Sequence, residues 1–197
     1  MTTDSDAAKD DSIGEAKMTA ALQPREFERK PYSEKRLGEE ALAAWEFDDL
    51  PPGAALTHVT LLPYRGERAV VAWRDGAMAL PEGDVAAGET AARAIARIAA
   101  DQVGILQATA THLGHFRYRA TSASKTLASG TITYQAVYGV EAGGLADFPR
   151  DPAFERRLVT QRELNPLVRR GHLEFVHEYA DALDIYLLAR LTAKLPE

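Results

Sequence analysis

The sequence predicts an α/β fold in which helices pack on a mixed β-sheet. Segments rich in β-branched and aromatic residues come both before and after one Ala-rich amphipathic segment, which indicates the order strands, helix, strands. A second amphipathic segment lies near the end of the chain. No stretch of the sequence repeats, so a repeat architecture is not expected.

The composition is that of an ordinary globular protein of 197 residues, with 46% hydrophobic and 26% charged residues. The net charge of -6 does not favour nucleic acid as a partner, because the phosphate backbone rewards a basic surface. The absence of cysteine excludes disulfides, thiolate nucleophiles and cysteine-ligated metal sites. The acidic start lacks a secretory signal, and no segment is apolar enough to span a membrane. We therefore expect a cytoplasmic protein without a membrane partner.

Two parts of the chain are expected, with a boundary at 50/51. Residues 1–50 are predicted to be a mostly disordered acidic tail and an arm, because residues 1–20 carry few large apolar groups to offset the entropy of ordering. The Glu-, Lys-, Arg-, Leu- and Ala-rich segment that begins at Ser33 is predicted to be a helix or an arm on the domain. A Pro-Pro-Gly turn then leads into the domain itself, residues 51–197.

The domain begins with a predicted β-hairpin. Residues 58–62 and 68–74 are both β-like, and a polar turn joins them. Asp75 and Gly76 are a turn signal after the second strand. Residues 80–83 are predicted to be a loop, because their proline is rigid and their glycine is permissive.

An amphipathic helix is predicted from Glu89 to Val103 because the segment is rich in alanine and its apolar residues recur at three- and four-residue spacing. Gly104 is a natural stop, since glycine readily adopts the left-handed conformation that ends a helix. The residues expected on one side of the helix are Ala91, Ala94, Ile95, Ile98, Ala99 and Gln102.

Two further strands are predicted at residues 105–119 and 131–142, with a small polar loop between them. His112 and His115 are not expected to chelate one ion, because residues three apart on a regular strand face opposite sides. A short strand at 157–159 follows.

Helices complete the predicted fold. Thr160 and Glu163 match a capping box, in which each side chain satisfies a free backbone donor of the other, so a short helix is expected to begin there. The last helix is predicted from His172 to Ala193. Its expected buried stripe is formed by Leu173, Val176, Leu183, Tyr186, Leu187 and Leu191.

One segment resembles the motif of a known family. Residues 80–105 read LPEGDVAAGETAARAIARIAADQVGI, which is similar to the Nudix box, G-x5-E-x7-R-E-U-x-E-E-x-G-U, where U is apolar. The segment follows a predicted hairpin and leads into a predicted helix, as in Nudix hydrolases. The matching positions are Gly83, Glu89, Arg97, Ala99, Gly104 and Ile105.

The resemblance implies an α/β/α sandwich with a mixed sheet, one box helix and a C-terminal helix. It also implies a pyrophosphohydrolase that uses Mg²⁺ or Mn²⁺ to cleave a nucleoside diphosphate linked to another moiety, as in ADP-ribose or a nucleotide sugar. In the family, three acidic residues on one helix face bind the metal, since hard cations prefer oxygen ligands. Those positions fall here on Ile98, Asp101 and Gln102, which are related by i, i+3 and i+4.

Candidate site residues come from the resemblance and from the charged residues around the box segment. The candidate catalytic residues are Asp101, Glu89 and Arg97. The candidate metal ligands are Asp101, Gln102 and Glu141. The candidate residues for contact with a bound ligand are Gly83, Glu82 and Arg74. Glu89 and Arg97 also fit a scaffold role, because the family uses this pair to hold the box loop against the helix.

The sequence leaves different functions open. The first is a divergent Nudix hydrolase with Mg²⁺ or Mn²⁺ as cofactor. The second is a non-catalytic module without a cofactor that binds a nucleotide-type small molecule or a protein partner, because Ile98 and Gln102 are not carboxylates. A third is a structural interaction domain, in which residues 27–47 and the last helix form a homo-oligomer contact.

Overall fold

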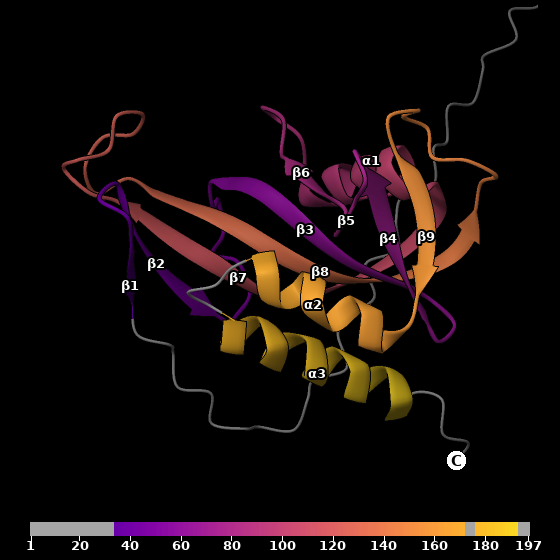
Figure 1. The fold of residues 1–197 in the computed structure, drawn as a ribbon. Coiled ribbons are helices and arrows are strands. Elements are labelled where there is room, and N and C mark those ends of the chain that lie inside the picture. Colours follow the sequence, from indigo (N-terminus) through magenta and orange to yellow (C-terminus); the bar gives the residue numbers. More distant parts are fainter. Residues whose placement is uncertain (1–33, 172–175, 193–197) are drawn as a thin grey trace, which may run out of the picture.

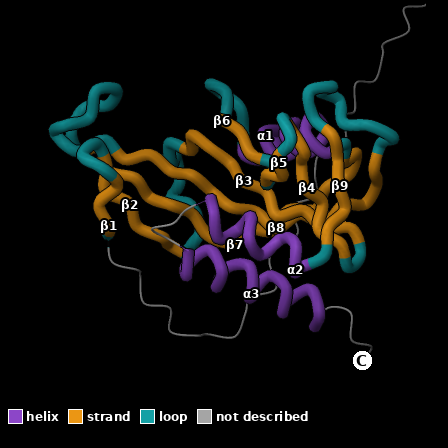
Figure 2. Tube along the Cα trace, viewed as in Figure 1, coloured by secondary structure: helices purple, strands orange, loops and turns teal. Residues whose placement is uncertain are grey.

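A nine-stranded sheet organises the part of the chain that the structure, a computed structural model, describes, namely residues 34–171 and 176–192. One helix covers one face of this sheet and two helices cover the other (Figure 1). Figure 2 shows the same three layers with the helices in purple and the strands in orange. The α/β/α sandwich predicted from the sequence is therefore confirmed.

The strands follow the order β1-β2-β7-β8-β3-β4-β5 across the sheet, while β6 pairs with β3 and β9 with β4. β3 and β8 run parallel and the other pairs run antiparallel, so the sheet is mixed. The strands are β1 (Lys35–Leu37), β2 (Ala41–Glu46), β3 (Leu56–Arg65), β4 (Arg68–Arg74), β5 (Ala77–Ala79), β6 (Glu82–Asp84), β7 (Ile105–Ala120), β8 (Ile132–Leu145) and β9 (Glu155–Val159). The helices are α1 (Ala91–Val103), α2 (Gln161–Gly171) and α3 (Val176–Thr192).

The two faces of the sheet carry two hydrophobic cores. Side chains alternate between the faces along each strand, so Val59 and Val140 pack in the core beneath α1. Leu62 and Val137, from the same two strands, pack in the core beneath α2 and α3. None of the helices among the described residues has the length and apolar character needed to cross a membrane.

α1 begins and ends through local interactions that the sequence makes visible. The Thr90 hydroxyl accepts a hydrogen bond from the backbone N–H of Arg93 over 3.3 Å, which caps the first turn. Gly104 adopts a φ of 66° and donates its N–H to the carbonyl of Ala100, which ends the helix. The predicted helix is confirmed. Its buried residues are Ala94, Ile95, Ile98, Ala99 and Val103.

The segment expected to be a helix or an arm forms β1 and β2 instead. β2 pairs with β7, and Trp45, opposite Phe116, is fully buried. The sheet therefore begins on the N-terminal side of the expected boundary at 50/51. The error has a physical reason, because β2 is too short for its composition to separate a strand from a helix. Residues 1–33, predicted to be mostly disordered, lie outside the described residues.

His112 and His115 lie on the same face of the sheet, contrary to the expectation from regular alternation. Leu113 has no partner in the register with β8, so it forms a β-bulge. His112 is consequently opposite Tyr138 and His115 opposite Ala136, and these two partners share a face. The histidine rings stack with their centroids 5.6 Å apart and their planes at 23°.

Gly114, beside the bulge, is required by a close approach of β2. Its φ of 148° lies in a region that favours glycine. A Cβ atom there would lie 2.4 Å from Cζ2 of Trp45 and 2.8 Å from the carbonyl oxygen of Glu46. The bulge, the histidine pair and the seating of β2 on β7 are therefore parts of one local arrangement.

The capping box before α2 is confirmed. The Thr160 backbone N–H donates to a carboxylate oxygen of Glu163 over 2.7 Å, and the Glu163 N–H donates to the Thr160 hydroxyl over 3.3 Å. On α3, Leu183 and Tyr186 are buried and Leu187 is partly buried, as expected. The side chains of Leu173, Val176 and Leu191, assigned to the same stripe, lie outside the described residues.

The contact between Gly139 and Tyr186 should limit how β8 and α3 pack. A Cβ atom at Gly139 would lie 2.5 Å from Cε2 and Cζ of Tyr186, whose side chain is buried in the core. We expect Gly139→Ala to lower the free energy of unfolding by about 1–3 kcal/mol, the usual effect of overpacking. Urea denaturation measures this. Gly144→Ala on the same strand is the matched control, because its Cβ atom would meet only Cβ of Leu106 at 3.8 Å. Equal stability of the two variants would contradict the packing argument.

Candidate functional site

β6 and the loop that follows it, residues 82–90 and here called the box loop, are held on α1 by one arginine. Arg97 donates from Nε and Nη2 to the two carboxylate oxygens of Glu89 over 2.9 and 2.8 Å, and from Nη2 to the carbonyl of Asp84 over 2.7 Å. The hydrogen bond from Arg97 lowers the pKa of Glu89 to about 2, and the N–H of Ala86 adds to this effect. Glu89 and Arg97 therefore form a bidentate pair that fixes the loop.

Ile98 occupies the first of the three positions that are acidic in Nudix hydrolases. Its side chain is buried in the core beneath α1, with 1% of the residue exposed. It packs directly on Gly83, since a Cβ atom at that glycine would lie 3.4 Å from Cγ1 of Ile98. The space between the helix and the box loop is therefore filled by hydrocarbon.

Gln102 uses both ends of its amide on the backbone of β6. Its Oε1 accepts the N–H of Glu82 over 3.1 Å, and its Nε2 donates to the carbonyl of Glu82 over 2.6 Å. This reciprocal pair imitates a strand neighbour and satisfies the first residue of β6. A carboxylate at this position could accept but could not donate, so the amide suits a structural role.

Asp101 pairs with a basic residue of the β8–β9 connection. Its Oδ1 lies 3.6 Å from Nη1 of Arg150, and its side chain is about one-third exposed. The backbone carbonyl of Asp101 also accepts the N–H of Asp151 over 3.0 Å. The end of α1 is thereby joined to the β8–β9 connection.

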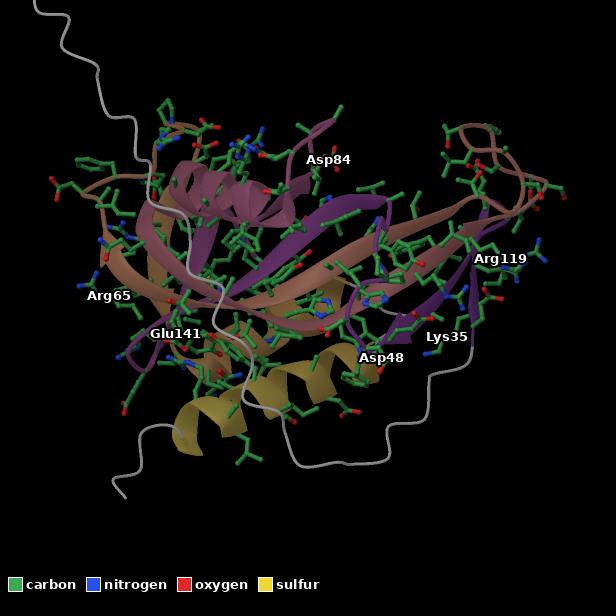
Figure 3. All side chains as sticks on the ribbon, turned by 180° about the vertical axis from the view of Figure 1, so that it is seen from behind. Lys35, Asp48, Arg65, Asp84, Arg119 and Glu141 are labelled. Atoms are coloured by element: carbon green, nitrogen blue, oxygen red, sulfur yellow. The ribbon has the colours of Figure 1, made fainter. Side chains whose placement is uncertain are left out.

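The structure does not bring Glu141 to Asp101 and Gln102. Glu141 lies on the α3 side of the sheet, where its carboxylate accepts the Tyr186 hydroxyl over 3.0 Å and the Arg190 Nη2 over 3.0 Å, with a further hydrogen bond from Arg190 Nε. Figure 3 shows Glu141 near α3, well apart from Asp84 beside β6. The expectation that it completes the box helix as a metal ligand is not met, because strand alternation turns it to the opposite face.

The candidate ligand-contacting residues are also separated. Gly83 faces α1, whereas Glu82, one residue before it, faces the other side with 54% of its side chain exposed. Arg74, at the end of β4, pairs with Asp75 over 3.3 Å and lies 5.2 Å above the ring of Phe154. Arg74 is thus engaged by its own turn and by the segment before β9.

The residues at the box do not fit the magnesium or manganese that the family resemblance implies. Such ions need several converging oxygen ligands. Ile98 offers none, the oxygen of Gln102 already accepts a backbone N–H, and Asp101 pairs with Arg150. Across the described residues, no group of three or more His, Asp or Glu side chains is arranged to hold a metal ion.

His58, which the sequence analysis did not single out, lies between the two carboxylates that flank Gly83. Its Nδ1 is 2.9 Å from Oδ1 of Asp84 and its Nε2 is 3.8 Å from Oε2 of Glu82. The Glu82 carboxylate and then the hydrogen bond with Asp84 raise the pKa of His58, against the opposing effect of burial. The β3–β6 register creates this group, and reading residues 80–83 as a loop concealed it.

Comparison with known proteins supports the fold. A mutant of the pyrophosphohydrolase BsRppH from Bacillus subtilis superposes with a TM-score of 0.55 at 18% sequence identity, over 84% of this chain and 99% of that chain. This chain has a Nudix-like fold. The resemblance carried by the box segment is confirmed at this level, and an identity of 18% extends it no further.

Other solved structures are more distant. A NUDIX hydrolase from Nitrosomonas europaea has a TM-score of 0.46 and 13% identity, over 67% of this chain and 89% of that chain. An ADP compounds hydrolase has a TM-score of 0.41 and 11% identity, over 85% and 98%. At these TM-scores neither adds to the assignment of the fold. No family model matches the sequence, and no curated protein matches it.

The packing of Ile98 predicts how the Nudix-like domain responds to a restored carboxylate. We expect Ile98→Glu to lower the free energy of unfolding by about 3 kcal/mol or more, because it buries an unpaired charge. Ile98→Val is the control and should cost about 0.5–1.5 kcal/mol. We also expect Mg²⁺ or Mn²⁺ to leave the Tm of the natural protein unchanged. A metal-induced rise in Tm that Asp101→Ala abolishes would show that the box does bind a cation.

The raised pKa of His58 predicts that the free energy of unfolding falls as the pH becomes alkaline. Because its folded-state pKa is raised, its stabilising effect is complete below the unfolded value of about 6.5 and disappears as the pH rises through the folded value. The exposed partners limit the effect to about 1 kcal/mol or less. Urea denaturation between about pH 6 and pH 9 should therefore show natural protein and His58→Gln converging in stability as the pH rises. Asp84→Asn should flatten the same dependence. A constant difference between natural protein and His58→Gln would disprove the role of the proton.

Proposed function

We propose that this Nudix-like domain is a non-catalytic binding module that holds its ligand without a divalent metal. The observation that carries the proposal is the closed box, in which Ile98 packs on Gly83 and the Gln102 amide binds both backbone groups of Glu82. Pyrophosphate hydrolysis by the family chemistry requires a metal that neutralises the phosphates and helps to activate water. At the three helix positions that bind it in the family, Ile98 has no oxygen, Gln102 binds Glu82 and Asp101 pairs with Arg150.

The preserved pair of Glu89 and Arg97 is consistent with this proposal. Its three hydrogen bonds fix the box loop on α1 regardless of any metal. A fold that keeps these contacts while its acidic face is replaced keeps a rigid loop and loses the chemistry. Function depends on the site more than on the fold, so the Nudix-like fold is compatible with binding alone.

The charge around the box indicates where a nucleotide-type ligand would not place its phosphates. The side chains of Glu82 and Asp84 are 54% and 92% exposed and flank Gly83. These exposed carboxylates disfavour the close approach of an anion. A nucleotide-type ligand would therefore contact this domain mainly through its base or sugar, whereas a hydrolase substrate presents its pyrophosphate to the box.

The experiment compares binding and turnover in one panel of ligands. Purified protein is incubated with ADP-ribose, NADH, a nucleotide sugar and nucleoside triphosphates, with Mg²⁺ and Mn²⁺ tested separately and products followed by mass spectrometry. We expect no product, and a rise in Tm with one ligand in the presence of a chelator. Ligand at a hundred times its Kd stabilises a protein by about 2.7 kcal/mol, which is readily detected.

The outcomes separate the alternatives. Metal-dependent turnover that Asp101→Ala abolishes would overturn the proposal in favour of a divergent hydrolase. If no ligand is turned over and none raises the Tm, the remaining alternatives are a protein partner or self-association. Sedimentation at several protein concentrations would detect self-association. The cytoplasmic location expected from the sequence is part of this proposal, since such nucleotides are abundant there.

A further inference from the structure

The segment that joins β2 to β3, residues 47–55, crosses a pair of buried histidines. β7 and β8 lie between β2 and β3 in the sheet, so this crossover segment must pass over both strands. Leu50 packs against the core beneath α1, which places the crossing on the α1 face. His112 and His115 lie on that face, stacked 5.6 Å apart (Figure 3 shows Asp48 of the crossover beside the end of β2).

Aromatic and acidic groups enclose the histidine pair. Tyr138 lies 5.3 Å from the ring of His112, and Tyr134 meets the ring of His115 edge-on at 5.4 Å. The Nε2 of His112 is buried without a hydrogen-bond partner among the described residues. The side chain of His115 is 1% exposed, and its Nε2 lies 3.2 Å from Oε2 of Glu46.

The acidic groups around the pair only partly compensate a charge on it. Glu46 also accepts the Nε of Arg117 over 2.6 Å, so its carboxylate is shared. From the crossover segment, Asp48 and Asp49 act on His115 and His112 respectively through their charges. Burial outweighs these carboxylates and lowers the pKa of both histidines, and the proximity of His115 contributes to lowering that of His112 to about 4.

The closed arrangement therefore holds fewer protons than the opened one. Between about pH 6.5 and pH 4, the histidines bind protons when the segment is open and hydrated but stay neutral when it is closed. The closed state therefore loses stability relative to the open state as the pH falls. The strand that carries the histidines cannot yield easily, because β7 is paired with β2 on one side and β8 on the other. The crossover backbone is held by Ala54 N–H to the carbonyl of Pro51 and by Tyr134 N–H to that of Ala55, while Phe47 and Leu50 anchor it on the two cores.

We propose that protonation of His112 and His115 lifts the crossover segment from the sheet while α1 and the sheet stay folded. The opening would hydrate the two imidazoles and expose Tyr134 and Tyr138 beside them. The crossover segment would then cover the half of the α1 face that the helix does not occupy at neutral pH and uncover it at acidic pH. This inference is independent of whether the domain binds or hydrolyses a ligand.

Hydrogen exchange on the full chain, followed by mass spectrometry and corrected for intrinsic rates, tests the proposal. Between about pH 7 and pH 5 we expect the amides of Ala54 and Tyr134, which form hydrogen bonds with crossover carbonyls, to lose protection by up to tenfold per pH unit for each proton taken up. The amides of α1 should keep their protection. A double variant, His112→Phe with His115→Phe, should remove the acid dependence. His58→Gln, which removes a histidine on the other face, should leave it intact.

Clear results would overturn the proposal. Equal loss of protection in α1 and in the crossover would mean global acid unfolding, and persistence of the acid response in the double variant would mean that other groups sense the proton. Should the double variant not fold, His112→Phe alone keeps the test decisive, because it removes one of the two imidazoles that carry a buried nitrogen without a partner among the described residues. An unchanged pH response in that single variant, together with histidine NMR signals of the natural protein that titrate near 6.5, would refute the inference.

Discussion

The seating of β6 on α1 is the constraint on which the rest of the site depends. Ile98 of the helix packs on Gly83, and Gln102 binds both backbone groups of Glu82. The same three-residue strand turns Glu82 and Asp84 to the opposite face, where His58 lies between them. Ile98 therefore places a hydrocarbon side chain where the family pattern has a carboxylate, against the backbone of β6.

What the sequence could predict was governed by local interactions. The helix, its Thr90 and Gly104 caps and the capping box of Thr160 depend on residues within one or two turns, and these predictions are confirmed. The replacement of acidic residues at positions 98 and 102 was also visible. The sequence could not show that Gln102 and Ile98 make their own contacts with Glu82 and Gly83.

The errors concern residues whose environment is created by distant partners. β2 is a strand because it pairs with β7 about seventy residues later, as the Arg117 contact with Glu46 shows with its separation of 71. The face on which Glu141 lies depends on the register of β8 with its neighbours, and a bulge at Leu113 brings His112 and His115 together. Single-sequence periodicity assumes unbroken alternation and does not reveal either feature.

The parallel pairing of β3 with β8 has a consequence for the order in which the molecule assembles. Thr57 and Tyr134, joined across this pair, are 77 residues apart, whereas β7 and β8 are joined by a short connection. Loop closure makes distant pairing slow, so the β7–β8 hairpin can form well before β3 joins it. β3, β6 and α1 lie within residues 56–103 and contact one another locally, so the candidate site can form apart from the β7–β8 hairpin and join it later. A chain emerging from the ribosome would already hold β3, β6 and α1 before β8 is synthesised.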